Sequence, residues 1–344
     1  MQAAELDFAR PPELQATTTA EDRGLRRDEV RLMVTTPEDT QHTTFSALPS
    51  HLRPGDLLVV NQSQTLPASL PAWTEPIGWF LINLSTWYGG PTWLAEPRWN
   101  PGSPGPLPLE ERQVIRIGGR EARLLSEYPG ISRLWFLRVD GGLWKAMRHT
   151  GRPIQYGYLS RSYPLEAYQT IFAQVPGSAE MPSAARPFTR SVLHRLGDRG
   201  IGVSPIVLHA GVSSLEIEAE RVEEQPLFPE PYEVPASTAR LVNETRARGG
   251  RVIAVGTTAV RALETAWDGE LVQPSTGFTR AFIHPERGLH AVDGLITGFH
   301  DPVTTHLAML HALAGSRAVR DAYKEAVRKG YLWHEFGDSH LLLT

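Results

Sequence analysis

Hydrophobic positions follow one pattern in the outer parts of the chain and another in its middle. Short apolar runs at residues 57–60 and 251–255 are bounded by turn residues, which is typical of strands buried on both faces of a sheet. Helices are predicted where apolar stripes end near a glycine, at residues 237–248, 303–314 and 316–329. The outer parts are therefore predicted to form an α/β domain.

The middle of the chain contains closely spaced short strands without helical periodicity. Strands are predicted at residues 79–84 and 133–139, and two more, at 112–117 and 121–125, flank Gly118-Gly119, a two-residue hairpin signal. Seven of the nine tryptophans lie in this same part of the chain. Closely spaced strands of this kind favour a small barrel or sandwich.

Length and pattern together predict the domain organisation. The 344 residues exceed the size of one typical domain. We predict a discontinuous α/β domain formed by residues 1–70 and 159–344, interrupted by a β-barrel insertion at residues 71–158.

Composition excludes several classes of protein and site. Hydrophobic residues make up 41% of the chain, but its aliphatic runs are far too short to span a bilayer. The chain has no cysteine, which excludes disulfides, thiolate nucleophiles and Cys-ligated metal centres. It opens without a secretion signal, so a cytoplasmic protein is expected. With a formal net charge of −4, binding to a nucleic acid requires a local basic face.

The strongest local feature is the segment 251–264, in which a predicted strand runs into Gly-Thr-Thr and then into a helix. This order aims free backbone N–H groups, two hydroxyls and the positive end of the helix at one place, which suits an anionic group. Gly256, Thr257, Thr258 and Arg261 are therefore predicted to bind substrate. The alternative is an ordinary strand-to-helix turn in which Thr257 or Thr258 caps the helix.

A second stretch, residues 291–302, combines two carboxylates, a histidine and two glycines in a loop-like region before a helix. Imidazole titrates near neutral pH and a carboxylate can orient it, so Asp293 and His300 are predicted to form an acid/base pair. The alternative is an Asp-Gly turn followed by an Asp-Pro helix start. His209, after an apolar run, is a second candidate base at the sheet edge, with a structural hydrogen-bonded histidine as its alternative.

No metal site is predicted. His306 and His311 are five residues apart on a predicted helix, about 140° around its axis, so they cannot chelate one ion. No HExxH motif is present.

Basic residues form three groups along the chain, each mixed with acidic neighbours. Solvated helix faces explain each group separately, whereas convergence of several groups on one face would mark an RNA-binding surface. The groups are Arg23, Arg26, Arg27 and Arg31; Arg186, Arg190, Arg195 and Arg199; and Arg317, Arg320, Arg328 and Lys329.

The chain resembles a known family in the same stretches that carry the candidate chemistry. The longest matching motifs are Val-Ile-Ala-Val-Gly-Thr-Thr at 252–258 and Val-Asp-Gly-Leu-Ile-Thr at 292–297. Further matches lie at residues 52–61, 168–170, 176–178, 208–209, 232–235, 299–300 and 336–338. On these motifs the chain is similar to the S-adenosylmethionine:tRNA ribosyltransferase-isomerases of queuosine biosynthesis. The predicted barrel matches poorly.

The resemblance implies an enzyme that transfers and isomerises the ribosyl part of S-adenosylmethionine onto a 7-aminomethyl-7-deazaguanine in a tRNA anticodon, releasing adenine and methionine. It implies S-adenosylmethionine as co-substrate, no bound cofactor or metal, and an α/β fold with a β-barrel insertion. A base is needed because the sulfonium acidifies the adjacent C5′ hydrogens. The last matching motif adds Asp338 to the predicted substrate-binding residues. We expect a monomer or weak oligomer that does not bind membranes.

The chain departs from the family pattern at several charged or titratable positions. Gln62, Gln64 and Ser69 stand where the family has an aspartate and two arginines, Pro187 where it has a histidine, and Val303 where it has a lysine. The stretch 209–215 also differs from the family pattern. Two alternatives therefore stay open: a divergent paralogue that uses another amine-bearing acceptor, and a protein that binds S-adenosylmethionine or RNA without catalysis.

Overall fold

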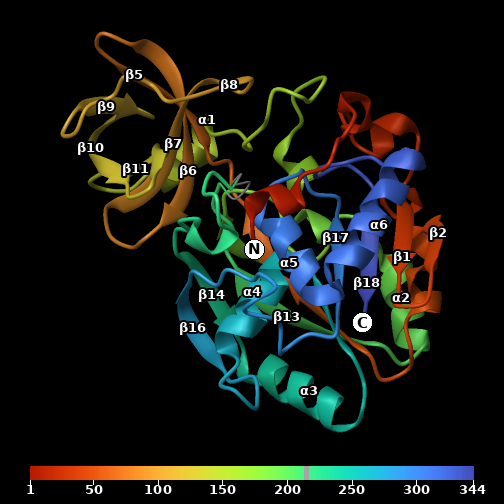
Figure 1. Ribbon diagram of the computed structural model, residues 1–344. Coiled ribbons are helices and arrows are strands. Elements are labelled where there is room, and N and C mark those ends of the chain that lie inside the picture. Colours follow the sequence, from red (N-terminus) through yellow and green to blue (C-terminus); the bar gives the residue numbers. More distant parts are fainter. Residues whose placement is uncertain (213–216) are drawn as a thin grey trace.

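The computed structural model describes residues 1–212 and 217–344 and contains an α/β body joined to a β-barrel (Figure 1). A nine-stranded sheet forms the centre of the body. Its strands, in order across the sheet, are β16 (Ser275–Thr279), β14 (Glu230–Val234), β13 (Gly202–Leu208), β3 (Leu57–Asn61), β15 (Val252–Val255), β17 (Gly294–Gly298), β18 (Ser339–Leu343), β1 (Arg31–Thr35) and β2 (Thr40–Thr44).

Four neighbouring strands of this sheet, β13, β3, β15 and β17, run parallel to one another. Every residue of β3 and β15 is buried, so the predicted two-faced burial of both runs is confirmed. Leu57 and Val59 pack on the face covered by helices α3, α4, α5 and α6, whereas Leu58 and Val60 pack on the face covered by α2. The helices are α2 (Arg190–Asp198), α3 (Ala236–Ala247), α4 (Thr257–Ala266), α5 (Thr305–Ala314) and α6 (Ser316–Arg328).

The three predicted helices are present as α3, α5 and α6, with bounds that differ by at most two residues. The largest difference is at the start of α5. Val303 has a positive φ of 55°, which is incompatible with a helix, and the side chain of Thr304 caps α5 by accepting a hydrogen bond from Leu307 N.

The barrel is built from a seven-stranded antiparallel sheet in which β11 also pairs with β7, closing a ring of six strands. The predicted hairpin at Gly118-Gly119 is confirmed, and both glycines have the positive φ that such a turn requires. The strands are β5 (Ser69–Thr74), β6 (Gly78–Trp87), β7 (Thr92–Asn100), β8 (Ser103–Pro104), β9 (Val114–Ile117), β10 (Arg120–Tyr128) and β11 (Ile131–Arg138), and the short helix α1 (Trp144–Thr150) follows them.

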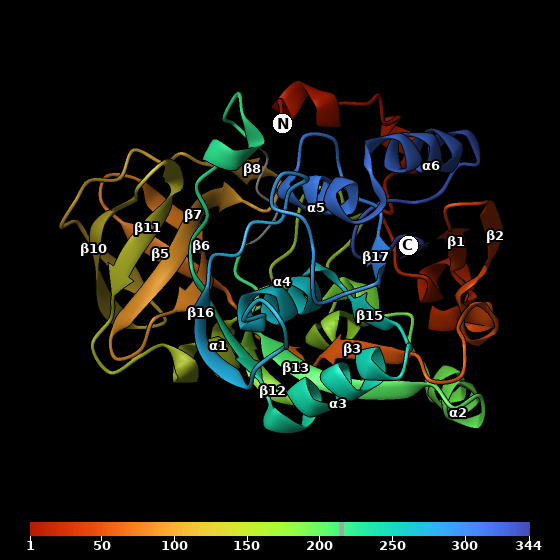
Figure 2. The ribbon, with the colours of Figure 1, turned by 60° about the horizontal axis from the view of Figure 1, so that its bottom comes forward.

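An α/β domain with an inserted β-barrel is therefore the observed fold. The exact domain limits stay a prediction. In both ribbon views the barrel lies at the β16 end of the large sheet, opposite β1 and β2 (Figures 1 and 2). A short parallel pair, β4 (Ser63–Thr65) with β12 (Val175–Ser178), lies outside both sheets. None of the helices in the described ranges is long and apolar enough to cross a membrane.

Candidate functional site

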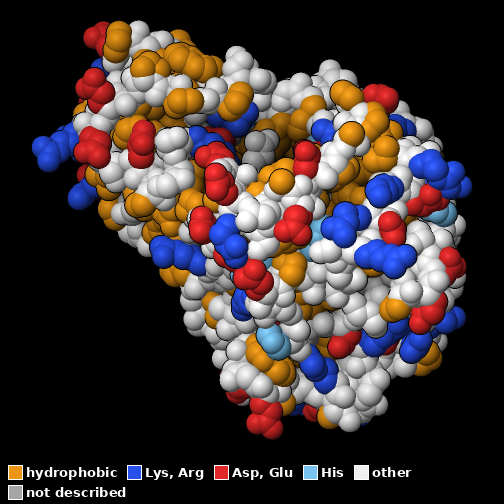
Figure 3. All heavy atoms as spheres, in the orientation of Figure 1, with side chains coloured by type: hydrophobic (Ala, Val, Ile, Leu, Met, Phe, Trp, Pro, Cys, Tyr) orange, Lys and Arg blue, Asp and Glu red, His pale blue; other side chains and the backbone are white. Residues whose placement is uncertain are grey.

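A cavity of about 240 Å³ lies at the carboxyl edge of the four parallel strands. Its lining includes Ala210 after β13, Gly256 after β15 and Thr297 at the end of β17. Tyr156 and Tyr158, which follow the barrel in sequence, line it as well. The carboxyl edge of parallel strands is where α/β proteins bind their ligands, because loops from neighbouring strands meet there. The molecular surface is hollowed where the barrel meets the body (Figure 3).

The Gly-Thr-Thr turn lies in this cavity, as all three residues line it. Gly256 is the N-cap of α4 and has φ 91° and ψ 154°, a conformation that essentially only glycine adopts. No side chain among the described residues caps the helix, so the alternative in which Thr257 or Thr258 acts as N-cap is not observed. Thr258 Oγ1 instead accepts a hydrogen bond of 3.2 Å from Asn61 Nδ2. The first N–H groups of α4 therefore have no intrahelical acceptor, which leaves them for a ligand.

Arg261 also lines the cavity, and its charge is balanced by Glu230. Glu230 is 1% exposed and forms an ion pair with Arg261 Nη1, while its other oxygen accepts a 2.7 Å hydrogen bond from Gly211 N. Arg261 Nε is buried without a hydrogen-bond partner among the described residues. The guanidinium is thus fixed in place and retains one unused donor.

His300 lines the cavity and is held by three hydrogen bonds. Its ring Nε2 lies 2.7 Å from Thr297 Oγ1. Its backbone N–H donates to the Tyr323 hydroxyl at 3.2 Å, and its backbone carbonyl accepts from Trp333 Nε1 at 2.9 Å. Burial lowers the pKa of His300 well below its usual value, and neighbouring His306 lowers it further, whereas Asp301 opposes the shift. Burial therefore favours the neutral form of the His300 imidazole.

His306, on α5, lines the same cavity with its ring centroid 4.8 Å from that of His300. Burial, with a smaller contribution from Arg261, lowers the pKa of His306 to about 4. Two neutral imidazoles thus lie side by side.

The expected pair of Asp293 and His300 is not formed, because the two residues lie at opposite ends of β17. Asp293 precedes the strand at the amino edge of the sheet, and its Oδ2 accepts a 2.8 Å hydrogen bond from Val252 N at the start of β15. A five-residue strand spans about 17 Å. Asp293 therefore holds two strands together, and the carboxylate beside His300 is Asp301.

His209 and Asp338 do not line the cavity. His209 Nδ1 lies 2.7 Å from Ser63 Oγ, and burial lowers the pKa of this imidazole to about 4. Asp338 accepts hydrogen bonds from the backbone N–H of Arg31 at 2.9 Å and of Leu332 at 2.9 Å, and it forms a 3.0 Å ion pair with the Arg31 guanidinium. Both side chains are engaged in contacts that hold neighbouring segments together.

An aromatic and acidic wall of the cavity was not predicted from the sequence. The rings of Tyr156 and Tyr158 stack with centroids 6.0 Å apart, and Tyr158 stacks on His334 at 4.8 Å. Their hydroxyls donate to Glu180 and Glu335, respectively. The spacing of two tyrosines around Gly157 is the one signal in the sequence for this wall.

Asp301 connects the wall to the N-terminal segment. It forms ion pairs with Arg10 Nε at 2.7 Å and His334 Nε2 at 3.1 Å. Burial alone raises the pKa of Asp301, but the contact with His334 and the charge of Arg10 outweigh it, so the pKa falls below its usual value. A carboxylate is thus maintained beside the buried imidazole of His300.

Within the stretch 209–215, which departs from the family pattern, Ala210 lines this cavity. The five departures at charged or titratable positions lie outside its described lining. They are Gln62, Gln64, Ser69, Pro187 and Val303. In the stretch 209–215, residues 213–215 lie outside the described residues.

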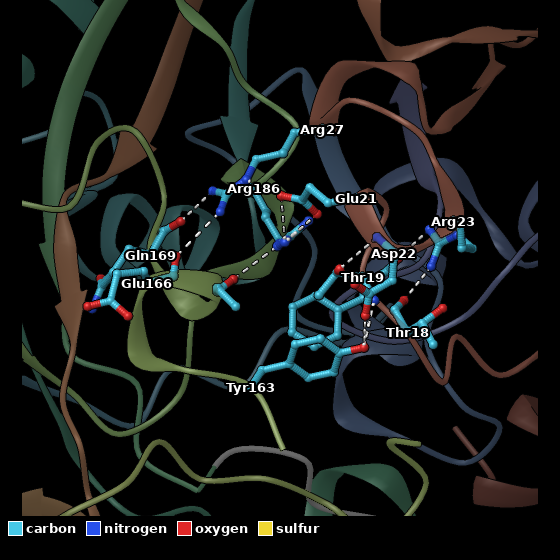
Figure 4. Close-up of polar contacts among 12 residues, drawn as sticks. Thr18, Thr19, Glu21, Asp22, Arg23, Arg27, Tyr163, Glu166, Gln169 and Arg186 are labelled. Atoms are coloured by element: carbon cyan, nitrogen blue, oxygen red, sulfur yellow. Dashed lines mark hydrogen bonds and ion pairs between the residues drawn. The ribbon is translucent and has the colours of Figure 1, made fainter. Parts of the chain in front are cut away.

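The first two basic groups contribute arginines to internal contacts. Glu21 accepts hydrogen bonds of 2.9 Å from both Arg27 and Arg186 (Figure 4). Burial opposes ionisation of Glu21, but the charge of Arg186 and the hydrogen bonds lower its pKa to about 2. Arg23 donates to the Phe336 carbonyl at 2.8 Å. These four side chains bind the N-terminal segment to the rest of the body.

In the third group, exposed ion pairs within α6 join Arg317 to Asp321 and Arg328 to Glu325. These contacts agree with the interpretation of the group as a solvated helix face.

Within the described ranges, one set of side chains has the spacing of metal ligands, namely Glu223, His284 and Glu286. The Met1 ammonium forms ion pairs with Glu223 at 2.5 Å and with Glu286 at 3.1 Å, so a cation of the chain itself already lies between the two carboxylates. The set is not part of the cavity lining.

Comparisons with known proteins agree with this site. The family model described as queuosine biosynthesis protein matches residues 3–342. The S-adenosylmethionine:tRNA ribosyltransferase-isomerase of Anaeromyxobacter dehalogenans is 38% identical over 353 residues, covering 100% of this chain and 99% of the relative. The enzyme of the same name from Moorella thermoacetica is 35% identical and covers 100% of both chains.

A solved structure is similar over the whole length as well. The crystal structure of S-adenosylmethionine tRNA ribosyltransferase from Thermotoga maritima has a TM-score of 0.55 and 31% identity, and the match covers 98% of this chain and 100% of that one. The chain belongs to the family of queuosine biosynthesis proteins.

Proposed function

We propose that this chain is an S-adenosylmethionine:tRNA ribosyltransferase-isomerase. It transfers and isomerises the ribosyl part of S-adenosylmethionine onto 7-aminomethyl-7-deazaguanine in tRNA, giving epoxyqueuosine and releasing adenine and methionine. The observation that carries the proposal is the cavity at the carboxyl edge of the parallel strands. It combines a helix N-terminus, a fixed arginine and a buried neutral imidazole in a chain whose full-length relatives bear this name.

His300 is the proposed base for the first step. The sulfonium acidifies the C5′ hydrogens of the donor, and removal of one proton gives an ylide. Adenine then leaves with cleavage of its glycosidic bond, the acceptor amine bonds to the ribosyl group, and closure of the epoxide is accompanied by cleavage of the C–S bond that releases methionine. A neutral imidazole at pH 7 can accept that proton, and Thr297 Oγ1 at 2.7 Å fixes the ring. The Asp301 carboxylate favours the imidazolium that forms.

The turn around Gly256 is the proposed anchor for an anionic group of the substrates, either the methionine carboxylate of the donor or a phosphate. Free N–H groups at the start of α4 and the unused donor of Arg261 both suit an anion. Tyr156 and Tyr158 add aromatic surface to the cavity wall, which suits the planar base of a substrate.

S-adenosylmethionine is thus the proposed co-substrate, without a separate bound cofactor, and the anticodon region of tRNA is the proposed partner. The reaction takes place in the cytoplasm, on a monomer or weak oligomer.

The test is incubation of the protein with S-adenosylmethionine and an anticodon stem-loop RNA that carries the aminomethyl-deazaguanine. Release of adenine together with a ribosyl-derived mass gain on the RNA is the expected result. Adenine release without that mass gain would point to another acceptor, and donor binding without either product would point to a binding protein. Either outcome would refute the proposed reaction.

A further inference from the structure

A second concave surface lies between the barrel and the segment that leaves it. A groove of about 610 Å³ is lined by Trp79 and Trp99 from the barrel and by Arg152 from the segment after α1. Large apolar side chains are normally buried, yet Trp79 is 73% exposed and Trp99 is 43% exposed. Two indole rings are therefore available on the wall of a groove.

This groove continues into a neighbouring one of about 430 Å³. The two share the lining residues Arg152, Pro153, Gln155 and Ser162, and the second adds Arg148. Together they form the channel that we call the tryptophan groove, defined by the lining residues of both.

The tryptophan groove is basic. Arg98, Arg148 and Arg152 line it, and no aspartate or glutamate is found among the described residues of its lining. Arg148 and Arg152 are exposed, and their side chains form no ion pair with any described residue. Arg98 is 7% exposed, and its Nε has no hydrogen-bond partner in the described part of the chain. Arg98 also forms a 3.2 Å ion pair with the buried Glu96, so its charge is balanced. The exposed Arg148 and Arg152 have no such partner among the described residues, which suits a polyanion.

The tryptophan groove and the cavity described above share one segment of the chain, whose alternate residues line one or the other. Along the extended segment, Pro153 and Gln155 line the groove, whereas Ile154 and Tyr156 line the cavity. The Arg98 guanidinium, which lines the groove, lies 5.4 Å from the ring centroid of Tyr156. A polymeric ligand that places one of its units in the cavity therefore has the neighbouring units close to the groove.

We propose that the tryptophan groove binds the unpaired loop nucleotides that flank the modified base of the RNA substrate. Trp79 and Trp99 stack on bases, and Arg148 and Arg152 contact phosphates. Proteins that bind single-stranded nucleic acid combine these two elements, because every base has a π-face and every linkage a negative charge. The inference rests on the proposed function, since it assigns the surface that holds that reaction's RNA.

The test measures RNA binding and turnover separately. Fluorescence anisotropy with a labelled anticodon stem-loop gives the Kd for RNA without S-adenosylmethionine, and adenine release gives turnover. W79A and W99A are each expected to raise the Kd about 5- to 100-fold, as loss of one stacked base does. W79Y, which keeps a ring, is expected to restore most of the affinity. R148Q and R152Q are each expected to reduce the slope of log Kd against log salt by about 0.7.

Matched controls separate the groove from general effects. Trp87 is 42% exposed on the barrel but does not line the groove, and Arg317 lies on α6. W87A and R317Q are expected to bind RNA as the unmodified chain does. Thermal unfolding checks that each variant is folded.

The outcomes distinguish the two proposals. An unmodified chain that turns over, with groove variants that keep its Kd and salt slope, would overturn the groove and leave the reaction standing. An unmodified chain that binds RNA through the groove without releasing adenine would overturn the reaction and leave the groove standing. Failure of the unmodified chain to bind the RNA would overturn both.

Discussion

Replacement of Gly256 by alanine tests whether the turn after β15 binds an anionic group. Gly256 has φ 91° and ψ 154°, and a Cβ built on it comes no closer than 3.4 Å to Ala184 and 3.5 Å to Thr258 Oγ1. Space is therefore available for the methyl group, and the perturbation acts on the backbone conformation rather than on packing.

The magnitude follows from that conformation. A non-glycine residue in this region of φ and ψ costs about 1–3 kcal/mol. The chain either bears this strain, which lowers the free energy of unfolding by that amount, or rotates the turn and moves the N–H groups of Thr257 and Thr258. A lost hydrogen bond to a charged group is worth about 1.5–3 kcal/mol, which corresponds to a ten- to hundredfold rise in the KM for S-adenosylmethionine.

Gly249 supplies a matched control, because it also has a positive φ, 75°, and a Cβ there has nothing within 4 Å. It follows α3, away from the cavity lining. G249A is expected to lower stability by about 1–2 kcal/mol without changing the KM for S-adenosylmethionine.

Urea unfolding and steady-state adenine release, measured on both variants, test the reasoning. G256A is expected to raise the KM for S-adenosylmethionine, whereas G249A is expected to lose stability without a change in this KM. If G256A is destabilised as G249A is, but keeps the KM for both S-adenosylmethionine and RNA, the turn does not bind an anionic group of either substrate.

Three further predictions concern other parts of the structure. H300Q is expected to reduce kcat for adenine release at least a hundredfold with an unchanged unfolding midpoint, and turnover within threefold of the unmodified chain would exclude His300 as the base. D293N is expected to lower the free energy of unfolding by about 1–3 kcal/mol while kcat is retained, since Asp293 contacts Val252 N; a loss of kcat in the folded variant would contradict this structural role. Burial lowers the pKa of His340 to about 3 from 6.5, so its neutral form is favoured in the folded state, and the free energy of unfolding is expected to fall as pH decreases from 6.5 to 3. In H340Q the free energy of unfolding should fall less steeply over this pH range, and a slope identical to that of the unmodified chain would refute the contribution of His340.

The body and barrel were predictable because their periodicities differ. Leu57 to Val60 form a continuous apolar run, which is typical of a strand covered on both faces, and the glycine pair at 118–119 marks a hairpin by its need for positive φ. The Gly-Thr-Thr turn was predictable because a buried strand that meets a helix at a glycine has few alternative geometries.

The Asp293–His300 pair was predicted wrongly because residues 294–298 were interpreted as part of a loop. In a loop, residues seven apart can meet. As the strand β17, the same residues place Asp293 at the amino edge of the sheet and His300 at its carboxyl edge. Between the two glycines of β17 only Leu295 and Ile296 are apolar, so local pattern alone favours a turn.

The tyrosine and glutamate wall was beyond local pattern altogether. Tyr158 lies 177 positions before Glu335, to which its hydroxyl donates, and the intervening chain forms most of the body. A contact of this kind depends on how the segment after the barrel folds back over the sheet, which no periodicity in residues 151–164 encodes.

Local charge, rather than the net charge of −4, determines whether this chain can hold RNA. Arg27 and Arg186 share the carboxylate of Glu21, which reduces the charge that they offer to a ligand. Charges more than about 8 Å away are largely screened at physiological salt, so acidic residues elsewhere weaken a basic groove little. Arg148 and Arg152 have no such partner among the described residues, and Arg152 lines the same groove as the exposed Trp79 and Trp99. The surplus of acid over base across the whole chain is therefore compatible with a strongly salt-dependent contact at one groove.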